Sequence, residues 1–178
     1  MKVNSNENKI IFKLISKQNI HLGTIQGMSY NKIYDLIATH SLDKTVKIHL
    51  FKENKLKILN TFDNRIDNSR GLFKRILFTE NTLFIFSKNN MVFGYSYPFR
   101  EEHLMIKIGP LNSSIVKILK KENLLVICTK KSIYLFDDYK MICCVDNACF
   151  MAITDGFIYN NTIFVSSLDG FVASIRIN

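Results

Sequence analysis

The sequence predicts an all-β protein assembled from similar four-stranded units. Its apolar residues come in short runs, many of them alternating with polar residues, which is the pattern of β-strands and not of helices. Turns rich in Asn, Asp and Lys separate these runs, among them Glu80-Asn81 and Tyr159-Asn160-Asn161. Many short strands between such turns favour a sandwich or a propeller.

The spacing of the runs indicates a repeat and decides between these two folds. Strands that look equivalent begin near Ile25, Arg75, Ile115 and Phe150, at intervals that scatter around 40 residues. A sandwich has no reason to repeat at that length, whereas a β-propeller repeats a four-stranded blade every 40 to 45 residues or so. We therefore expect a single domain, residues 1–178, with a leading strand at 9–16 and blades at about 20–62, 70–108, 112–146 and 147–178.

The individual strands follow from the apolar runs in chain order. Each blade needs four strands, because a single hairpin cannot bury both of its faces and the blades must stack to form a core. The expected strands are 9–15, 24–29, 34–39, 45–51, 55–61, 72–79, 82–87, 91–97, 104–108, 114–119, 124–129, 132–136, 140–145, 150–154, 162–167 and 171–177.

One segment has the signature of a particular kind of blade. Residues 38–49 read ATHSLDKTVKIH, which resembles the strand–turn–strand of a WD repeat, usually written SGSxDxTVKIWD. Residues 165–175, VSSLDGFVASI, are a fainter copy. Two such units near opposite ends make the chain a candidate WD-repeat array, and arrays of this kind are usually scaffolds and not enzymes.

The motif predicts a polar network that stabilises the blade. The aspartate of the tight turn is expected to accept hydrogen bonds from local backbone and from His21. Thr39 or Ser41 would contact the residue in the tryptophan slot, which is His49 in this tryptophan-free chain. His40 and His103 show no evident partner and are expected to face solvent. The residues assigned to the network are His21, Thr39, Ser41, Asp43, His49 and Asp169.

Composition limits the classes of function. The longest apolar runs, such as residues 124–128, are far shorter than the roughly 18 residues of a membrane span, and the N-terminus lacks the layout of a signal peptide. We therefore expect an intracellular protein without a membrane partner. The formal charge is +9, but the basic residues are scattered and only five of the 24 are Arg, so we do not expect direct nucleic-acid binding.

No catalytic or ligand-binding pattern is recognised. The sequence has no GxSxG, HExxH or glycine-rich phosphate loop, and the adjacent acidic pairs at 101–102 and 137–138 point to opposite faces of a strand. The four cysteines lack the spacing of zinc ligands and are expected in the core. We predict no enzymatic activity, no metal, no cofactor and no small-molecule substrate.

Four segments, taken in order, resemble one WD-repeat family, the middle subunit of chromatin assembly factor one. Residues 24–30, TIQGMSY, are similar to its YVQGVAWD, and residues 72–79, LFKRILFT, to its FFRRLSFTPDG. Residues 132–137, SIYLFD, resemble its SVLLYD, and residues 152–170 resemble its last blade. Hir-type histone chaperones share the first and last of these features. They lack the Phe-Arg-Arg signature that Phe73-Lys74-Arg75 echoes.

The resemblance implies a non-enzymatic, nuclear scaffold subunit of a three-subunit histone chaperone. Such a complex deposits histones three and four on newly replicated DNA, and this subunit contacts them directly or through another subunit. The family's propeller docks against the large subunit, for which Phe73, Lys74 and Arg75 are candidate contacts. The alternatives are a Hir-type, replication-independent chaperone subunit and a WD-repeat scaffold outside chromatin.

The resemblance also implies a seven-bladed ring, of which this chain would supply the C-terminal portion. Four blades form an open arc, and apolar end faces of that size rarely stay bare on a soluble monomer. The expected explanations are a truncated or reduced chain, which we favour, a partner chain that completes the ring, or self-association.

Overall fold

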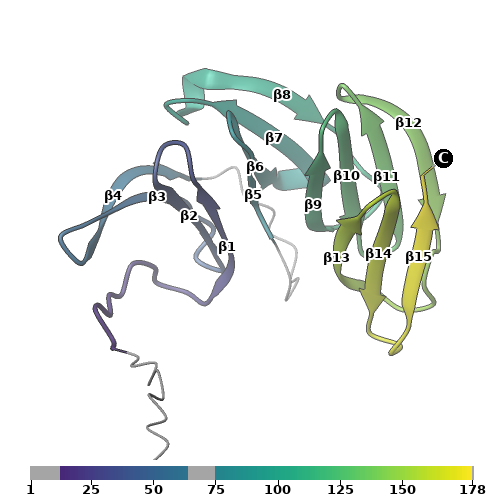
Figure 1. Ribbon diagram of the computed structural model, residues 1–178, viewed down its shortest axis with the longest axis horizontal. Helices are drawn as coiled ribbons and strands as arrows, with labels where there is room; N and C mark the ends of the chain where they lie inside the picture. The colour runs from purple at the N-terminus through teal and green to yellow at the C-terminus, as the bar shows by residue number, and fades with distance from the viewer. Residues whose placement is uncertain (1–12, 64–74, 178) are drawn as a thin grey trace, which may run out of the picture.

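The computed structural model describes residues 13–63 and 75–177, and their regular structure is almost entirely β-strand. The strands form four antiparallel sheets arranged as successive blades (Figure 1). Two single-turn 3-10 helices, η1 (Lys88–Asn90) and η2 (Glu101–His103), interrupt the second blade. The prediction of an all-β, partial propeller is confirmed.

Each blade is a meander in which consecutive strands pair side by side. Blade 1 contains β1 (Ile25–Asn31), β2 (Leu36–Ser41), β3 (Val46–Lys52) and β4 (Lys55–Phe62). Blade 2 contains β5 (Leu77–Phe78), β6 (Thr82–Ser87), β7 (Met91–Ser96) and β8 (Leu104–Ile108). Blade 3 contains β9 (Ile115–Lys121), β10 (Leu124–Thr129), β11 (Ser132–Asp137) and β12 (Lys140–Asp146). Blade 4 contains β13 (Ile153–Tyr159), β14 (Thr162–Ser167) and β15 (Val172–Arg176).

The blades form an arc in which the first strand of each blade lies on the inner side. Strand β1 lies beside β5 and β9 lies beside β13, and a parallel bridge between Arg75 and Lys117 joins blades 2 and 3 (Figure 1). The last strand of each complete blade lies at the outer rim. The inner strands therefore face a shared hollow.

The core consists of three apolar layers, one between each pair of adjacent blades. The layer between blades 1 and 2 includes Ile48 and Phe62 against Leu83 and Tyr95. Because side chains alternate along a strand, neighbouring residues of one strand enter different layers. Leu125 packs toward blade 2 while Val126 packs toward blade 4. A central strand that is buried on both faces, such as β10, therefore has a continuous apolar run.

Several expected elements differ from those observed. The expected leading strand at 9–16 falls partly outside the described residues, and its described part, residues 13–16, has no regular secondary structure. The strand expected at 150–154 instead runs from Ile153 to Tyr159, across Gly156. A Cβ at that glycine would lie 3.1 Å from the Phe164 carbonyl oxygen, so the glycine permits a close strand pair and does not mark a turn. In the described residues, blade 4 has three strands and not four.

Candidate functional site

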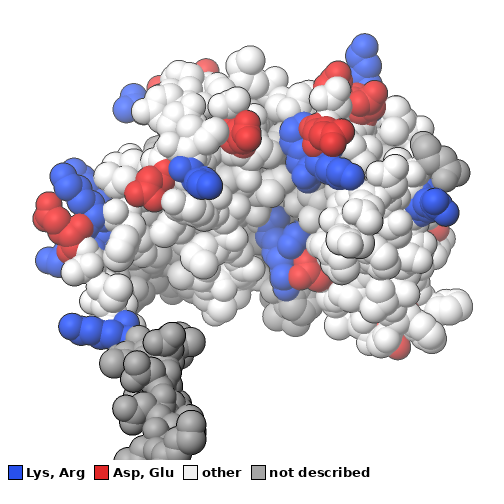
Figure 2. Space-filling view, viewed as in Figure 1, with Lys and Arg blue, Asp and Glu red and all other residues white. Residues whose placement is uncertain are grey.

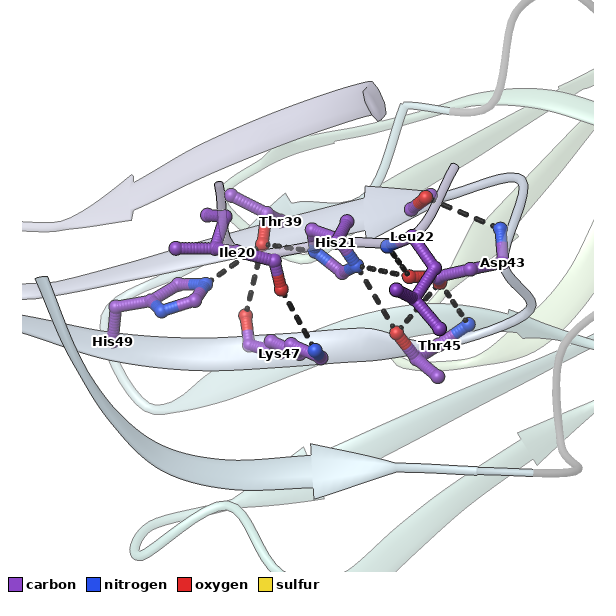
Figure 3. Close-up of polar contacts among 9 residues, drawn as sticks. Ile20, His21, Leu22, Thr39, Asp43, Thr45, Lys47 and His49 are labelled. Carbon is purple, nitrogen blue, oxygen red and sulfur yellow. Dashed lines mark hydrogen bonds and ion pairs between the residues drawn. The ribbon is translucent and has the colours of Figure 1, made fainter. Parts of the chain in front are cut away.

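A row of polar side chains crosses the face of blade 1 that points away from blade 2 (Figure 3). His21 precedes β1, Thr39 lies on β2, Asp43 is in the β2–β3 turn and His49 lies on β3. His21 Nδ1 is 2.9 Å from Asp43 Oδ2, and His21 Nε2 is 2.8 Å from Thr39 Oγ1. His49 Nε2 is 2.8 Å from the same hydroxyl oxygen. The structure therefore brings these four predicted residues together.

The direction of the hydrogen bonds follows from which groups can donate. The Asp43 carboxylate only accepts, so His21 Nδ1–H is the donor and His21 Nε2 accepts from the Thr39 hydroxyl. The Thr39 oxygen then accepts from His49 Nε2–H. His49 thus supplies the N–H that the tryptophan indole supplies in the usual WD pattern.

Asp43 also organises the tight turn. The Leu22 amide donates to its Oδ2 at 2.9 Å, and Thr45 donates to its Oδ1 from the amide at 3.0 Å and from the hydroxyl at 2.7 Å. Burial by itself would raise the pKa of Asp43, but the hydrogen bonds from Thr45, His21 and Leu22 outweigh it and lower that pKa to about 2. Thr45 was not assigned to the network from sequence, although it occupies the threonine of the DxTV signature.

Ser41 and His49 have distinct roles in the blade 1 network. Ser41 does not contact the tryptophan slot, because its Oγ accepts from the Asp43 amide at 3.2 Å. Thr39 is therefore the residue that joins His21 to His49. Burial is the main reason that the pKa of His49 is lowered to about 4, so its imidazole is neutral at pH 7.

The fainter copy in blade 4 reproduces the turn without the histidine. Asp169 accepts hydrogen bonds from the Met151 amide at 3.1 Å, the Phe171 amide at 3.2 Å and the Ser167 hydroxyl. Phe150 precedes Met151 as His21 precedes Leu22, so it occupies the position of the missing histidine, and its side chain is almost fully exposed. Asp169 therefore accepts from two backbone amides and one hydroxyl, as Asp43 does, but it lacks the histidine donor that Asp43 has in His21.

A second polar cluster, which sequence reasoning missed, lies where three blades meet on the inner side of the arc. Asp155 of blade 4 forms ion pairs with Arg75, which precedes β5, and with Lys117 of blade 3, whose Nζ is 3.1 Å away. The Arg75 amide also donates to the Val116 carbonyl at 3.0 Å. No local motif signals this cluster, because its members are far apart in sequence and come together only when the blades stack.

The inner strands border a hollow of about 650 Å³ beside this cluster. The described residues that line it include four basic side chains, Arg75, Lys117, Lys120 and Lys121, and no acidic one. Figure 2 shows blue and red side chains interspersed over this face of the molecule, not one continuous basic patch. Two of the four basic side chains, Arg75 and Lys117, are already paired with Asp155, and Lys121 Nζ donates to the Asn160 carbonyl at 2.6 Å.

The candidate partner contacts are placed only in part. Phe73 and Lys74 lie outside the described residues. The side chain of Arg75 is about one-third exposed and pairs with Asp155, so it contributes to the junction of the blades.

Two expectations about single residues are wrong. His40, expected in solvent, is buried between blades 1 and 2 with its ring edge-on to Phe86 at 5.9 Å, since its position on β2 points toward blade 2. Of the cysteines expected in the core, Cys128 is buried, but Cys143 and Cys144 are exposed because β12 is an outer strand. Burial raises the pKa of the Cys128 thiol to about 12.

The described residues, 13–63 and 75–177, contain no group of three or more His, Cys, Asp or Glu side chains arranged to hold a metal ion. None of their helices has the length and apolar character needed to cross a membrane.

Solved structures with the same arrangement of blades include WD40 domains. The chain aligns with the C-terminal WD40 domain of Sif2 at a TM-score of 0.72 and 14% identity, covering 89% of this chain and 44% of that one. It aligns with the WD40 β-propeller domain of Doa1 at a TM-score of 0.69 and 14% identity, covering 88% and 52%. The fold is that of a WD40 β-propeller.

The chain also matches the computationally designed Ika4 protein, with a TM-score of 0.72, 15% identity, and coverage of 94% of this chain and all of that one. It spans about half the length of the two WD40 chains. No protein-family model and no curated protein sequence matches it. At these identities the comparisons establish the fold alone.

Proposed function

We propose that this protein is a non-enzymatic scaffold that acts by binding other proteins. The observation that carries the proposal is the WD40-type blade, complete with its His–Thr–Asp network in blade 1. That network stabilises a turn and leaves strand edges, loops and the inner hollow as rigid surfaces for partners. A rigid scaffold that presents loops is the usual mode of action of this architecture.

Within that class, we propose a nuclear subunit of a histone chaperone complex that assembles nucleosomes during DNA replication. The support is the ordered resemblance of four segments to the middle subunit of chromatin assembly factor one. The formal charge of +9 and the basic lining of the hollow suit an acidic segment of a partner protein. The proposed partners are the other subunits of the complex and, directly or through them, histones three and four.

Of the candidate contacts Phe73, Lys74 and Arg75, Arg75 also has a structural role. Charge reversal of Arg75 would place a second carboxylate against Asp155 and weaken the junction of three blades, so a lost interaction would be ambiguous. Lys74→Glu replaces neither member of that ion pair. Lys131→Glu, on an exposed turn of blade 3, is a matched control of the same chemistry.

The decisive experiment is affinity purification of the tagged protein from its native cells, followed by mass spectrometry. We expect a large chaperone subunit together with histones three and four, and weaker recovery with Lys74→Glu than with Lys131→Glu. Equal recovery with both variants would exclude Lys74 as a contact. Recovery of Hir-type partners would move the protein to the related family, and recovery of neither would refute the chromatin proposal and leave a scaffold acting elsewhere.

A further inference from the structure

The three internal layers define how one blade packs on the next. We call the face of a blade that points to the following blade its front face, and the opposite one its rear face. At one equivalent position of the second strand, the front-face residues are Ala38, Phe84, Val126 and Phe164. The first three are fully buried by the next blade, whereas Phe164 is only partly buried.

The rear faces show the same pattern at the other end of the arc. The adjacent position of the second strand is occupied by Ile37, Leu83, Leu125 and Ile163. The last three are fully buried, and only Ile37, in blade 1, is partly exposed. Both ends of the arc therefore carry, in the same register, the residue type that the internal interfaces bury.

The front face of blade 4 carries further apolar side chains beyond that one position, beside the polar Ser174 and Arg176 of β15. Phe157 pairs with Phe164 across β13 and β14, and their rings stack with centroids 5.0 Å apart. Phe157 is 57% exposed, and Tyr159 and Val172 are exposed on the same face. A stacked aromatic pair left in water loses most of the benefit of burial.

The rear face of blade 1 is also apolar, although the segment before β1 covers part of it. Lys47 Nζ donates to the Ile20 carbonyl at 2.7 Å, which holds that segment over the polar network. Beside it, Met28 is 70% exposed, and Tyr30 and Phe51 are exposed on the same face. The uncovered part therefore lies toward the inner strand and the far end of β3.

The two open faces are of the two kinds that pack together inside the arc. In each internal layer the front face of one blade packs against the rear face of the following blade. A front face therefore fits a rear face, whereas two front faces or two rear faces do not meet in any of these layers.

We propose that the front face of blade 4 packs against the rear face of blade 1 of a second copy of this chain. The contact is heterologous, and it closes when the second copy returns the same contact, which gives a two-fold ring of eight blades. The chain spans 52% of the Doa1 propeller chain, so two copies supply about the material of a complete propeller. Closure covers both end faces at once.

The test uses the purified 178-residue chain and measures its mass in solution by analytical ultracentrifugation between about 1 and 50 μM, the range in which a standard-size interface associates. We expect a species of twice 20.7 kDa that does not grow further with concentration. A monomer throughout would overturn the proposal. Larger, concentration-dependent assemblies would also overturn it, because they indicate an open array and not a closed pair.

Charge variants identify the faces. Phe157→Glu in blade 4 and Met28→Lys in blade 1 each alter a side chain that is exposed in the single chain, so folding should survive. Each variant alone should be monomeric, with an apparent dissociation constant raised at least tenfold, roughly what one unfavourable charge at an interface costs. Met105→Glu, on the outer strand of blade 2 and 72% exposed, is the matched control and should remain dimeric.

Mixing the two variants gives the sharpest result. A mixed pair retains one interface between two unaltered faces, and its other interface sets the introduced carboxylate of one copy against the introduced ammonium group of the other. We therefore expect Phe157→Glu and Met28→Lys to dimerise only when mixed. Dimers that persist in both single variants, or no recovery on mixing, would overturn the proposed pairing. Val172→Glu and Tyr30→Lys replace any variant whose circular dichroism shows loss of the fold.

Discussion

Replacing Asp43 by Asn tests the energetic role of the blade 1 network. The carboxylate accepts hydrogen bonds from His21, from the Leu22 amide and from both donors of Thr45. Together they lower its pKa from 3.8 to about 2. At about 1.4 kcal/mol per pH unit, that difference amounts to roughly 2.5 kcal/mol of stability at neutral pH. The amide keeps the shape of the side chain but turns an NH₂ group toward one of these donors, so we expect Asp43→Asn to cost about 2–3 kcal/mol.

The assay is urea unfolding followed by far-ultraviolet circular dichroism at pH 7, with unchanged m-values as the sign that only stability has changed. Asp169→Asn is the matched control, because Asp169 occupies the same turn in blade 4 without a histidine partner and should cost less. A folded-state pKa below the unfolded value stabilises the protein above pH 4 or so. The difference between wild type and Asp43→Asn should therefore shrink as the pH falls from about 4 toward 2. Equal losses in the two variants, or a difference that does not change with pH, would refute this account.

Three further predictions concern single positions. The pKa of His49 is about 4 in the folded chain and 6.5 in the unfolded chain, so the unfolded chain takes up the proton first as the pH falls. The free energy of unfolding should therefore decrease by up to about 3 kcal/mol between about pH 6.5 and pH 4. Urea unfolding midpoints should show this decrease, and the decrease should be smaller in His49→Gln. A thiol reagent should modify Cys143 in the native protein and Cys128 only on unfolding, and rapid native labelling of a variant that keeps only Cys128 would contradict its burial. In Gly94→Ala the new methyl would lie 3.1 Å from Phe84, so thermal unfolding should show a loss of about 1–3 kcal/mol, and an unchanged midpoint would mean that the layer between blades 2 and 3 has room to spare.

Much of the blade 1 network follows from local sequence because its members belong to one repeat. The LDKT turn places Asp43 and Thr45 within reach of each other whatever the rest of the chain does. The partner His21 follows from the spacing of the WD pattern. The choice between Thr39 and Ser41 required the structure, because both lie on β2 and only the tertiary arrangement decides which hydroxyl reaches His49.

Other features depend on how blades meet and have no local signature. Arg75, Lys117 and Asp155 come from three blades, so neither a motif nor a spacing could pair them. The burial of His40 and the exposure of Cys143 follow from which strand lies beneath another blade and which lies at the rim. The shifted start of β13 shows that a glycine can permit a close strand pair and not end a strand.

The sequence by itself determined the fold class, the order of the blades and the chemistry of the turn in blade 1. Period-two alternation and the DxTV turn involve only a few neighbouring residues, so they can be recognised from the sequence alone. Only the tertiary structure decided which apolar faces are buried between blades and which remain open at Phe164 and Ile37. These residues resemble their buried counterparts in sequence, and they differ only because no further described blade packs on them.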